Sequence, residues 1–204
     1  MSLRAFVVWL SLALTLSVAT PVGAQDPPPN PRVLVETTKG DFEIELFRNE
    51  TDVIATVVNF LGYVRDGYYD GTVFHRTMRD LLVQGGGFMV GEEGQLVPKV
   101  EGLRGQIVNQ ATRNLQNRRG TVAMARGGAP DSARQQFFVN LDDNSSFDFK
   151  NPTPEGIGYA VFGRVTDGLN VVRDIGRVRT GDQAPDVPNE PVVITSITRI
   201  EAAP

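Results

Sequence analysis

Cysteine is absent from this chain of 204 residues, and histidine occurs only once. Without cysteine the protein has no disulfide framework and no thiol nucleophile. A single histidine also excludes a metal site that is built from several histidines. Any chemistry that the chain performs must therefore use arginine, carboxylates, hydroxyls, amides and shape.

Positive charge is also limited. The chain has 20 Lys and Arg residues against 24 Asp and Glu, a net charge of −4, and it contains no basic run. Proteins that bind nucleic acid neutralise phosphates with clustered Lys and Arg, so we expect no nucleic-acid partner. The length and the 41% of hydrophobic residues suit one domain with a sizeable core.

Long apolar runs are missing except at the amino terminus. Arg4 precedes an uncharged apolar run over residues 5–18, and small residues follow at 22–24. This is the signal-peptide pattern, and the run is short for a membrane span. We expect residues 1–24 to be a signal peptide that is cleaved after Ala24, with a periplasmic or secreted product and no stable membrane insertion. An uncleaved anchor is the alternative.

Residues 25–31 are rich in proline, which indicates an extended linker before a folded domain over residues 32–201. Alternating and apolar runs predict strands at 33–38, 41–47, 72–76, 81–84, 120–126, 136–141, 159–165 and 191–197. Helical spacing predicts two helices, one opening at Asp52 and one over residues 169–175. Residues 85–118 are expected to be mostly loop. Many short strands with two helices favour a closed barrel capped by the helices, because closure removes edge strands.

Three sequence blocks are more specific than the rest. The first is VFHR at residues 73–76, followed by QGGGF at 84–88. The second is QQFFVN at 135–140, and the third is GYAVFG at 158–163. In this order and at these spacings the blocks resemble the cyclophilin family of peptidyl-prolyl cis/trans isomerases. The resemblance spans residues 32–201 and looks closest to the bacterial, periplasmic branch.

The resemblance implies an all-β dominated fold, a closed eight-stranded antiparallel barrel with two capping α-helices. It also implies an isomerase that needs no cofactor and no metal and acts on proline-containing polypeptides. We expect a monomer. The favoured function is isomerisation of Xaa-Pro bonds to assist the folding of exported proteins.

Prolyl isomerisation breaks no covalent bond, and its barrier of about 18–20 kcal/mol arises from lost amide resonance. In the twisted state the prolyl nitrogen regains a lone pair, so a cation that donates a hydrogen bond to it favours that state. Arginine suits this role because it stays charged and has a rigid planar fork. Arg76 is the candidate donor, and a surface arginine in a salt bridge is the alternative interpretation.

The other candidate site residues follow from the same blocks. Gln84 is expected to line the groove and to support Arg76 and the substrate backbone. Phe138 is expected to form the floor of a proline pocket, whereas Phe137 packs in the core, because neighbouring strand residues point to opposite faces. The remaining substrate-binding candidates are Leu81 and Leu82 on the pocket wall, Ala125 and Arg126 beside the substrate backbone, and Phe147 and Tyr159 on the far rim.

Several conspicuous residues are expected to be structural. Strand alternation places His75 on the face opposite to Phe74 and Arg76. No nucleophile-elbow pattern accompanies His75, which argues against a serine–histidine–carboxylate triad. The glycines at 85–87 lack a following Lys-Ser/Thr, so we expect a tight bend beside the groove and no phosphate loop. The acidic pair at 142–143 is expected to lie in a loop that does not bind a cation.

The chain departs from the usual family pattern at two places. Residues 79–82 are RDLL where the family usually has Pro-Gly-Phe-Met, so the wall of the pocket loses an aromatic ring. Ser146 stands where many members carry Trp or Phe, a loss expected to weaken cyclosporin binding more than catalysis. These departures leave an alternative open: a cyclophilin-like module that binds proline-containing segments with little or no turnover.

Overall fold

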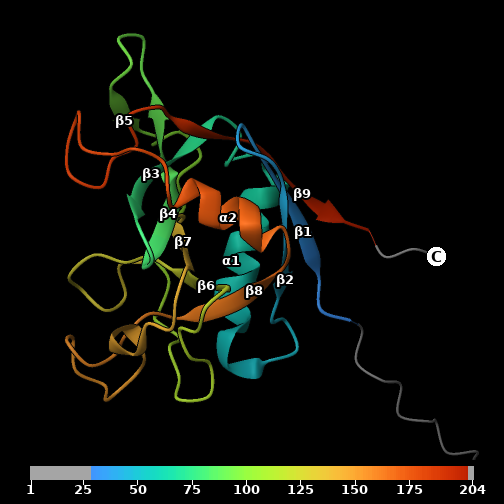
Figure 1. The fold of residues 1–204 in the computed structure, drawn as a ribbon. Coiled ribbons are helices and arrows are strands. Elements are labelled where there is room, and N and C mark those ends of the chain that lie inside the picture. Colours follow the sequence, from blue (N-terminus) through green and yellow to red (C-terminus); the bar gives the residue numbers. More distant parts are fainter. Residues whose placement is uncertain (1–28, 202–204) are drawn as a thin grey trace, which may run out of the picture.

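The computed structural model describes residues 29–201, in which the strands form a closed barrel (Figure 1). The strands of the barrel are β1 (Arg32–Thr37), β2 (Phe42–Leu46), β3 (Thr72–Met78), β4 (Leu82–Val90), β6 (Thr121–Met124), β7 (Phe137–Asn140), β8 (Val161–Asp167) and β9 (Val192–Ile200). Their order is β3-β9-β1-β2-β8-β6-β7-β4, and β3 pairs with β4 to close the ring. Every pairing is antiparallel. The predicted eight-stranded barrel is confirmed.

Two α-helices cover the barrel, as predicted: α1 (Ile54–Arg65) and α2 (Leu169–Ile175). In Figure 1 both helices lie within the outline of the ring of strands, with α2 in front of the ring and α1 behind it. Each helix buries one apolar face, which includes Phe60 on α1 and Ile175 on α2. Short 3-10 turns occur at η1 (Thr51–Val53) and η2 (Ser145–Phe147). Over residues 29–201, no helix combines the length and the hydropathy that crossing a membrane requires.

Alternation along the strands divides the buried apolar side chains into two clusters. The larger cluster fills the barrel, where the ring of Phe60 lies 5.5 Å from that of Phe137 and 5.1 Å from that of Phe162. The smaller one, here called the outer cluster, comprises Leu82, Ala123, Phe138 and Val161 on the other face of the same strands. As predicted, Phe137 packs in the core and Phe138 on the opposite face.

Residues 85–98 are not the loop that the sequence suggested. β4 continues to Val90 and pairs with β5 (Leu96–Pro98), which forms a hairpin that projects beyond the barrel. The bend expected at the glycine run lies inside this strand, where the four steps from Gly85 to Met89 match two steps of β3, and the glycines also permit other side chains to approach closely. Gly86 has φ +83°, and a Cβ there would lie 2.8 Å from Cε1 of Tyr69. Glycine inside a strand marks such close contacts.

A bulge in β3 changes which face its residues occupy. Phe74 pairs with Gly85 and Arg76 pairs with Gln84, so two steps along β3 match one step along β4. Phe74 consequently packs in the barrel core, whereas Arg76 lies on the outer face. The prediction that Phe74 and Arg76 share a face was wrong because His75 is the extra residue that shifts the alternation.

Candidate active site

A pocket of about 460 Å³ lies over the outer cluster and brings together every site residue that the sequence predicted. We call it the groove. Its lining residues are Arg76, Met78, Leu81, Leu82, Gln84, Ala125, Arg126, Phe138, Phe147 and Tyr159. Only Met78 was missed, although it follows Arg76 by two residues in β3, and strand alternation could have identified it. Segments from β3, β4, β6, β7 and η2 thus converge on one cavity.

Three aromatic rings shape the apolar part of the groove. Phe138 is only 3% exposed and meets Phe147 and Tyr159 edge to face, with ring centroids 5.8 and 5.5 Å away. The rings of Phe147 and Tyr159 are 5.3 Å apart. Each such pair contributes about 0.5–1.5 kcal/mol beyond its buried area, so the rings hold one another in place. The result is a rigid apolar recess suited to a small ring such as that of proline.

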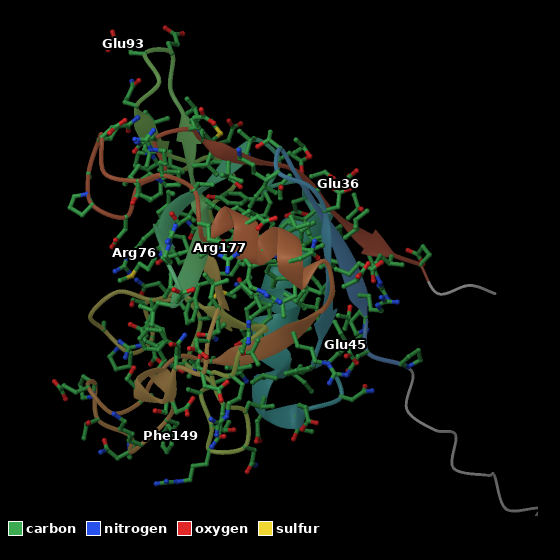
Figure 2. The ribbon with its side chains drawn as sticks, in the orientation of Figure 1. Glu36, Glu45, Arg76, Glu93, Phe149 and Arg177 are labelled. Carbon is green, nitrogen blue, oxygen red and sulfur yellow. The ribbon has the colours of Figure 1, made fainter. Side chains whose placement is uncertain are left out.

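Arg76 provides the cation of the groove. Its side chain is 46% exposed, and its Nε lies 3.5 Å from Oδ2 of Asp186. Figure 2 shows Arg76 at the periphery of the molecule, on the outside of the barrel wall. Gln84 faces it across the β3–β4 ladder, and Nε2 of Gln84 donates a hydrogen bond of 2.8 Å to Oε1 of Gln136. The side chain of Gln136 therefore orients the amide of Gln84.

Most N–H donors of the Arg126 guanidinium already bond to groups of the protein. Its guanidinium lies 5.0 Å from the centroid of the Tyr159 ring. It donates hydrogen bonds to the backbone carbonyls of Gly127, Gly128, Pro154 and Gly158 at 3.0–3.4 Å. Arg126 therefore orients Tyr159 and fastens residues 154–158 to the end of β6. Few of its donors remain for a substrate backbone.

The departure at residues 79–82 adds no charge to the wall of the groove. Asp80 has φ +57° in the turn between β3 and β4, and both Arg79 and Asp80 are exposed and do not line the groove. The wall is supplied by Leu81 and Leu82. The second departure, Ser146, is exposed on η2. The neighbouring Phe147 provides the aromatic ring on that side.

Three buried asparagines support both walls of the groove. Nδ2 of Asn144 donates to the carbonyl of Leu81 at 2.9 Å, and Nδ2 of Asn117 donates to the carbonyl of Phe147 at 3.1 Å. Asn140 lies between them, accepting a bond of 2.8 Å from Asn144 and donating one of 3.2 Å to Asn117. The sequence reasoning missed this network, for which an asparagine at the end of the apolar run 137–140 was the only local signal.

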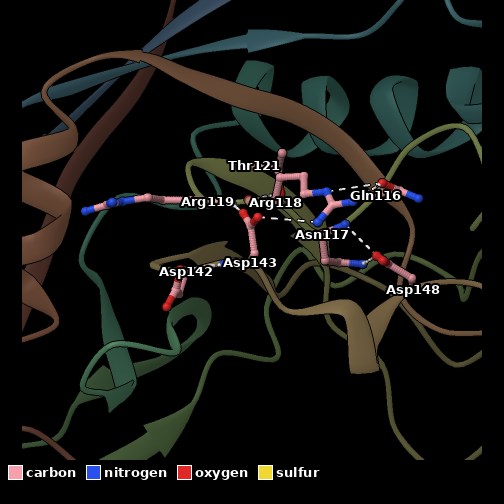
Figure 3. A network of polar contacts seen from close by, with 8 residues as sticks. All are labelled: Gln116, Asn117, Arg118, Arg119, Thr121, Asp142, Asp143 and Asp148. Atoms are coloured by element: carbon pink, nitrogen blue, oxygen red, sulfur yellow. Dashed lines mark hydrogen bonds and ion pairs between the residues drawn. The ribbon is translucent and has the colours of Figure 1, made fainter.

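Carboxylates tie the segment of Phe147 to the turn before β6 (Figure 3). Oδ1 of Asp148 accepts a hydrogen bond of 2.6 Å from the backbone N–H of Asn117. Asp143 accepts one from the N–H of Arg119 at 3.0 Å and another from the side chain of Arg118 at 3.3 Å. The acidic pair 142–143 thus lies in a loop, as expected. Residues 29–201 contain no group of three or more potential metal-ligating His, Cys, Asp or Glu side chains.

His75 is a buried neutral residue beside the groove. Its ring is 4.6 Å from that of Phe88, and burial lowers its pKa to about 4, against the 6.5 of a free histidine. Nδ1 of His75 has no hydrogen-bond partner among the described residues.

The described lining of the groove includes no carboxylate and no histidine. The groove therefore offers a cation, amides and apolar surface, with no group suited to act as a general base near neutral pH.

A second pocket, of about 360 Å³, adjoins the groove. It shares Gln84, Ala125 and Arg126 with the groove and continues over Arg134 and Gln136. The shared residues mean that an extended chain can lie across both pockets. The apolar recess would then hold one residue, and the polar pocket would hold a neighbour.

Comparison with known proteins agrees with this architecture. The family model described as "Cyclophilin type peptidyl-prolyl cis-trans isomerase/CLD" matches residues 32–199. A peptidyl-prolyl cis-trans isomerase of Streptomyces antibioticus is 46% identical over 168 residues, which is 80% of this chain and 95% of that protein. Peptidyl-prolyl cis-trans isomerase B of Escherichia coli is 43% identical over 168 residues, 81% of this chain and 98% of that protein.

Solved structures show the same fold. A crystal structure of a cyclophilin-type peptidyl-prolyl cis-trans isomerase from Cryptosporidium parvum superposes with a TM-score of 0.68 at 23% identity, covering 85% of this chain and 99% of that one. A second structure of that protein, in the presence of the dipeptide Ala-Pro, gives a TM-score of 0.66 at 22% identity and covers 84% of this chain. Barrel and groove together define an isomerase fold with an external binding site. The chain belongs to the cyclophilin-type peptidyl-prolyl cis-trans isomerase family, and its activity is the isomerisation of Xaa-Pro bonds.

Proposed function

We propose that Arg76 is the catalytic group and that Phe138 receives the proline ring of the substrate. The observation that supports this proposal is that both residues line one pocket of about 460 Å³. A proline seated on Phe138 brings its amide within the same cavity as the guanidinium. Gln84, at the junction of the two pockets, then holds the chain that flanks the proline.

In this mechanism Arg76 acts by binding the twisted amide more tightly than the planar one. Rotation pyramidalises the prolyl nitrogen, and an N–H of the guanidinium donates to the lone pair that appears there. The apolar rings exclude water, which strengthens this charge-assisted bond. Lowering the barrier by about 7–8 kcal/mol corresponds to an acceleration of roughly 10⁵- to 10⁶-fold. The reaction involves no proton transfer, which agrees with a groove whose described lining has no general base.

The physiological role that we propose is assistance in the folding of exported proteins, in the periplasm or outside the cell. Two observations support it: the leader-like residues 1–24, which lie outside the described residues, and the similarity to bacterial isomerases. Xaa-Pro bonds isomerise in roughly tens to hundreds of seconds without a catalyst, which is slow enough to limit folding. The clients would be proline-containing polypeptides, met by a monomer with no nucleic-acid partner and no stable insertion in the membrane.

A protease-coupled isomerisation assay with an Ala-Pro peptide distinguishes turnover from peptide binding without turnover. We expect the protein to accelerate the cis-to-trans step in proportion to its concentration. Binding of the same peptide without acceleration would instead support the alternative, a peptide-binding module with little turnover. The exposed positions of Arg79 and Asp80, away from the groove, argue against that alternative.

The proposed role in the folding of exported proteins is tested by a second assay, because turnover of a short peptide does not measure protein folding. A denatured exported protein whose refolding is limited by a non-native prolyl isomer should refold faster when this protein is added. A matched client whose refolding lacks a proline-limited phase should refold at an unchanged rate. Equal acceleration of both clients would indicate a general chaperone effect and contradict the proposal.

A further inference from the structure

Asp186 lies beside the proposed catalytic arginine although it is 110 residues further along the chain. Its Oδ2 is 3.5 Å from Nε of Arg76, and this is the only ion pair that Arg76 makes within residues 29–201. Asp186 does not line the groove or the adjoining pocket. Any effect of this carboxylate on a bound peptide must therefore be transmitted through Arg76.

The position of Asp186 is fixed by the backbone. Its carbonyl oxygen accepts a hydrogen bond of 2.7 Å from the N–H of Thr77, the residue that follows Arg76 in β3. The loop that carries Asp186 is closed by a bridge between Thr180 and Pro188. It is also attached to the β4–β5 hairpin, since Nε2 of Gln183 donates to the carbonyl of Gly94 at 3.3 Å. The carboxylate is thus presented to Arg76 by a loop that is fastened at several points.

The backbone conformation of Asp186 does not by itself require a carboxylate. Its φ is +64°, in the left-handed region that few residues other than glycine occupy. Asparagine and aspartate both tolerate this region, because their short polar side chains can bond locally. Asparagine at position 186 could therefore adopt the same backbone conformation. The ion pair adds little stability, since the side chains of Arg76 and Asp186 are 46% and 37% exposed.

We propose that Asp186 is a positioning residue that orients the guanidinium of Arg76, an inference that rests on the proposed catalytic role of Arg76. Asp186 lies on the Nε side of the planar fork, at an ion-pair distance of 3.5 Å, so that in this proposal the terminal nitrogens donate to the substrate. An arginine on a flexible stem samples many orientations, and one held at Nε loses less freedom when it meets the twisted amide. Asp186 therefore acts on the turnover step and has little influence on peptide binding.

The test compares Asp186→Asn with wild type in the isomerisation assay, measuring kcat and KM separately. We expect kcat to fall by about three- to tenfold while KM stays within about twofold, because the apolar recess is unchanged. Asp186→Glu should recover part of the lost kcat by restoring the charge. Asp182→Asn is the matched control: it removes the same charge from an exposed position in the same loop and should leave kcat unchanged.

A double variant separates positioning from loop damage. In an Arg76→Ala background, Asp186→Asn should cause no further loss of residual kcat, because the two residues act as one unit. An Asp186→Asn protein with unchanged or higher kcat, or with the same loss in both backgrounds, would overturn the proposal. If Arg76→Ala alone retains full activity, the catalytic assignment of Arg76 itself fails, which is a distinguishable result.

Discussion

Leu81 shows how a single groove residue can be tested. It is half-buried, packs against the outer cluster and lines the groove at a position where the sequence resemblance leads us to expect an aromatic ring. We expect Leu81→Phe to tighten the binding of proline peptides about fivefold, because the added apolar area contributes roughly 1 kcal/mol. Peptide titration together with the melting temperature measures the effect.

Leu82→Phe is the control for this substitution. Leu82 is only 4% exposed within the outer cluster, so a larger ring there should overpack and cost about 1–3 kcal/mol of stability. A Leu81→Phe protein that is destabilised with unchanged affinity would show that the side chain of Leu81 packs into the outer cluster and does not face a bound proline.

His75 makes stability depend on pH. Its pKa is lowered to about 4 in the fold by burial, against 6.5 when unfolded. Between these values the unfolded state takes up a proton that the folded state excludes. His75 therefore does not reduce the free energy of unfolding above pH 6.5. As the pH drops from 6.5 towards 4, the free energy of unfolding falls, by at most roughly 3 kcal/mol. Urea unfolding of wild type and His75→Gln across this range should show a shallower pH slope in the variant. Identical slopes would exclude this role of His75.

At the scale of elements, the position of η2 depends on the asparagine network. Asn117 is fully buried and donates to the carbonyl of Phe147 and to Asp148. Both acceptors keep a backbone donor, the N–H of Tyr159 and that of residue 117. Asn117→Ala removes the two side-chain hydrogen bonds at about 0.5–1.5 kcal/mol each, so we expect a loss of about 1–3 kcal/mol of stability and a higher KM as Phe147 shifts. Asn114→Ala, in the exposed part of the same loop, is the control and should change neither quantity. A destabilised Asn117→Ala protein with unchanged KM would uncouple the network from the groove.

Local patterns predicted the elements well where neighbouring residues alone decide the conformation. The helix over Leu169–Ile175 was predicted with its observed bounds, and alternation separated Phe137 from Phe138 correctly. Prediction failed where tertiary contacts override propensity. Glycine is a poor strand former, yet β4 runs through three glycines, and at Gly86 the ring of Tyr69 leaves no room for a Cβ. The bulge at His75 could not be predicted for a similar reason, since it exists only in relation to the register of β4.

At the scale of the whole molecule, closure of the barrel brings distant segments to one external groove. Most of the residues predicted from sequence lie in or next to the three blocks, Ala125, Arg126 and Phe147 lie between them, and their meeting follows from the family resemblance. Asp186 has no such signal, and of the asparagine network only Asn140 lies in one of the blocks. Their contacts with Arg76 and Phe147 depend on β9 closing against β3 and on the packing of long loops, neither of which a single sequence specifies.

The export of the molecule is a separate prediction. A small residue at position 24 ends the apolar leader just before the proline-rich segment, so we expect cleavage after Ala24. Amino-terminal sequencing of protein recovered from the periplasm or medium should begin at Gln25. A mature protein that begins at Met1 would contradict both the signal peptide and the proposed location.

The central claim is that the cation of Arg76, facing the recess of Phe138, carries the isomerisation. The most direct measurement is kcat/KM for an Xaa-Pro peptide with wild type, Arg76→Ala and Arg76→Lys, each with its melting temperature. We expect Arg76→Ala to lose at least about tenfold in kcat/KM, which is about 1.4 kcal/mol of transition-state stabilisation. Arg76→Lys should fail as well, because an ammonium lacks the planar fork. Both variants should melt close to wild type, since the side chain is half exposed. An Arg76→Ala protein with wild-type kcat/KM would contradict the mechanism.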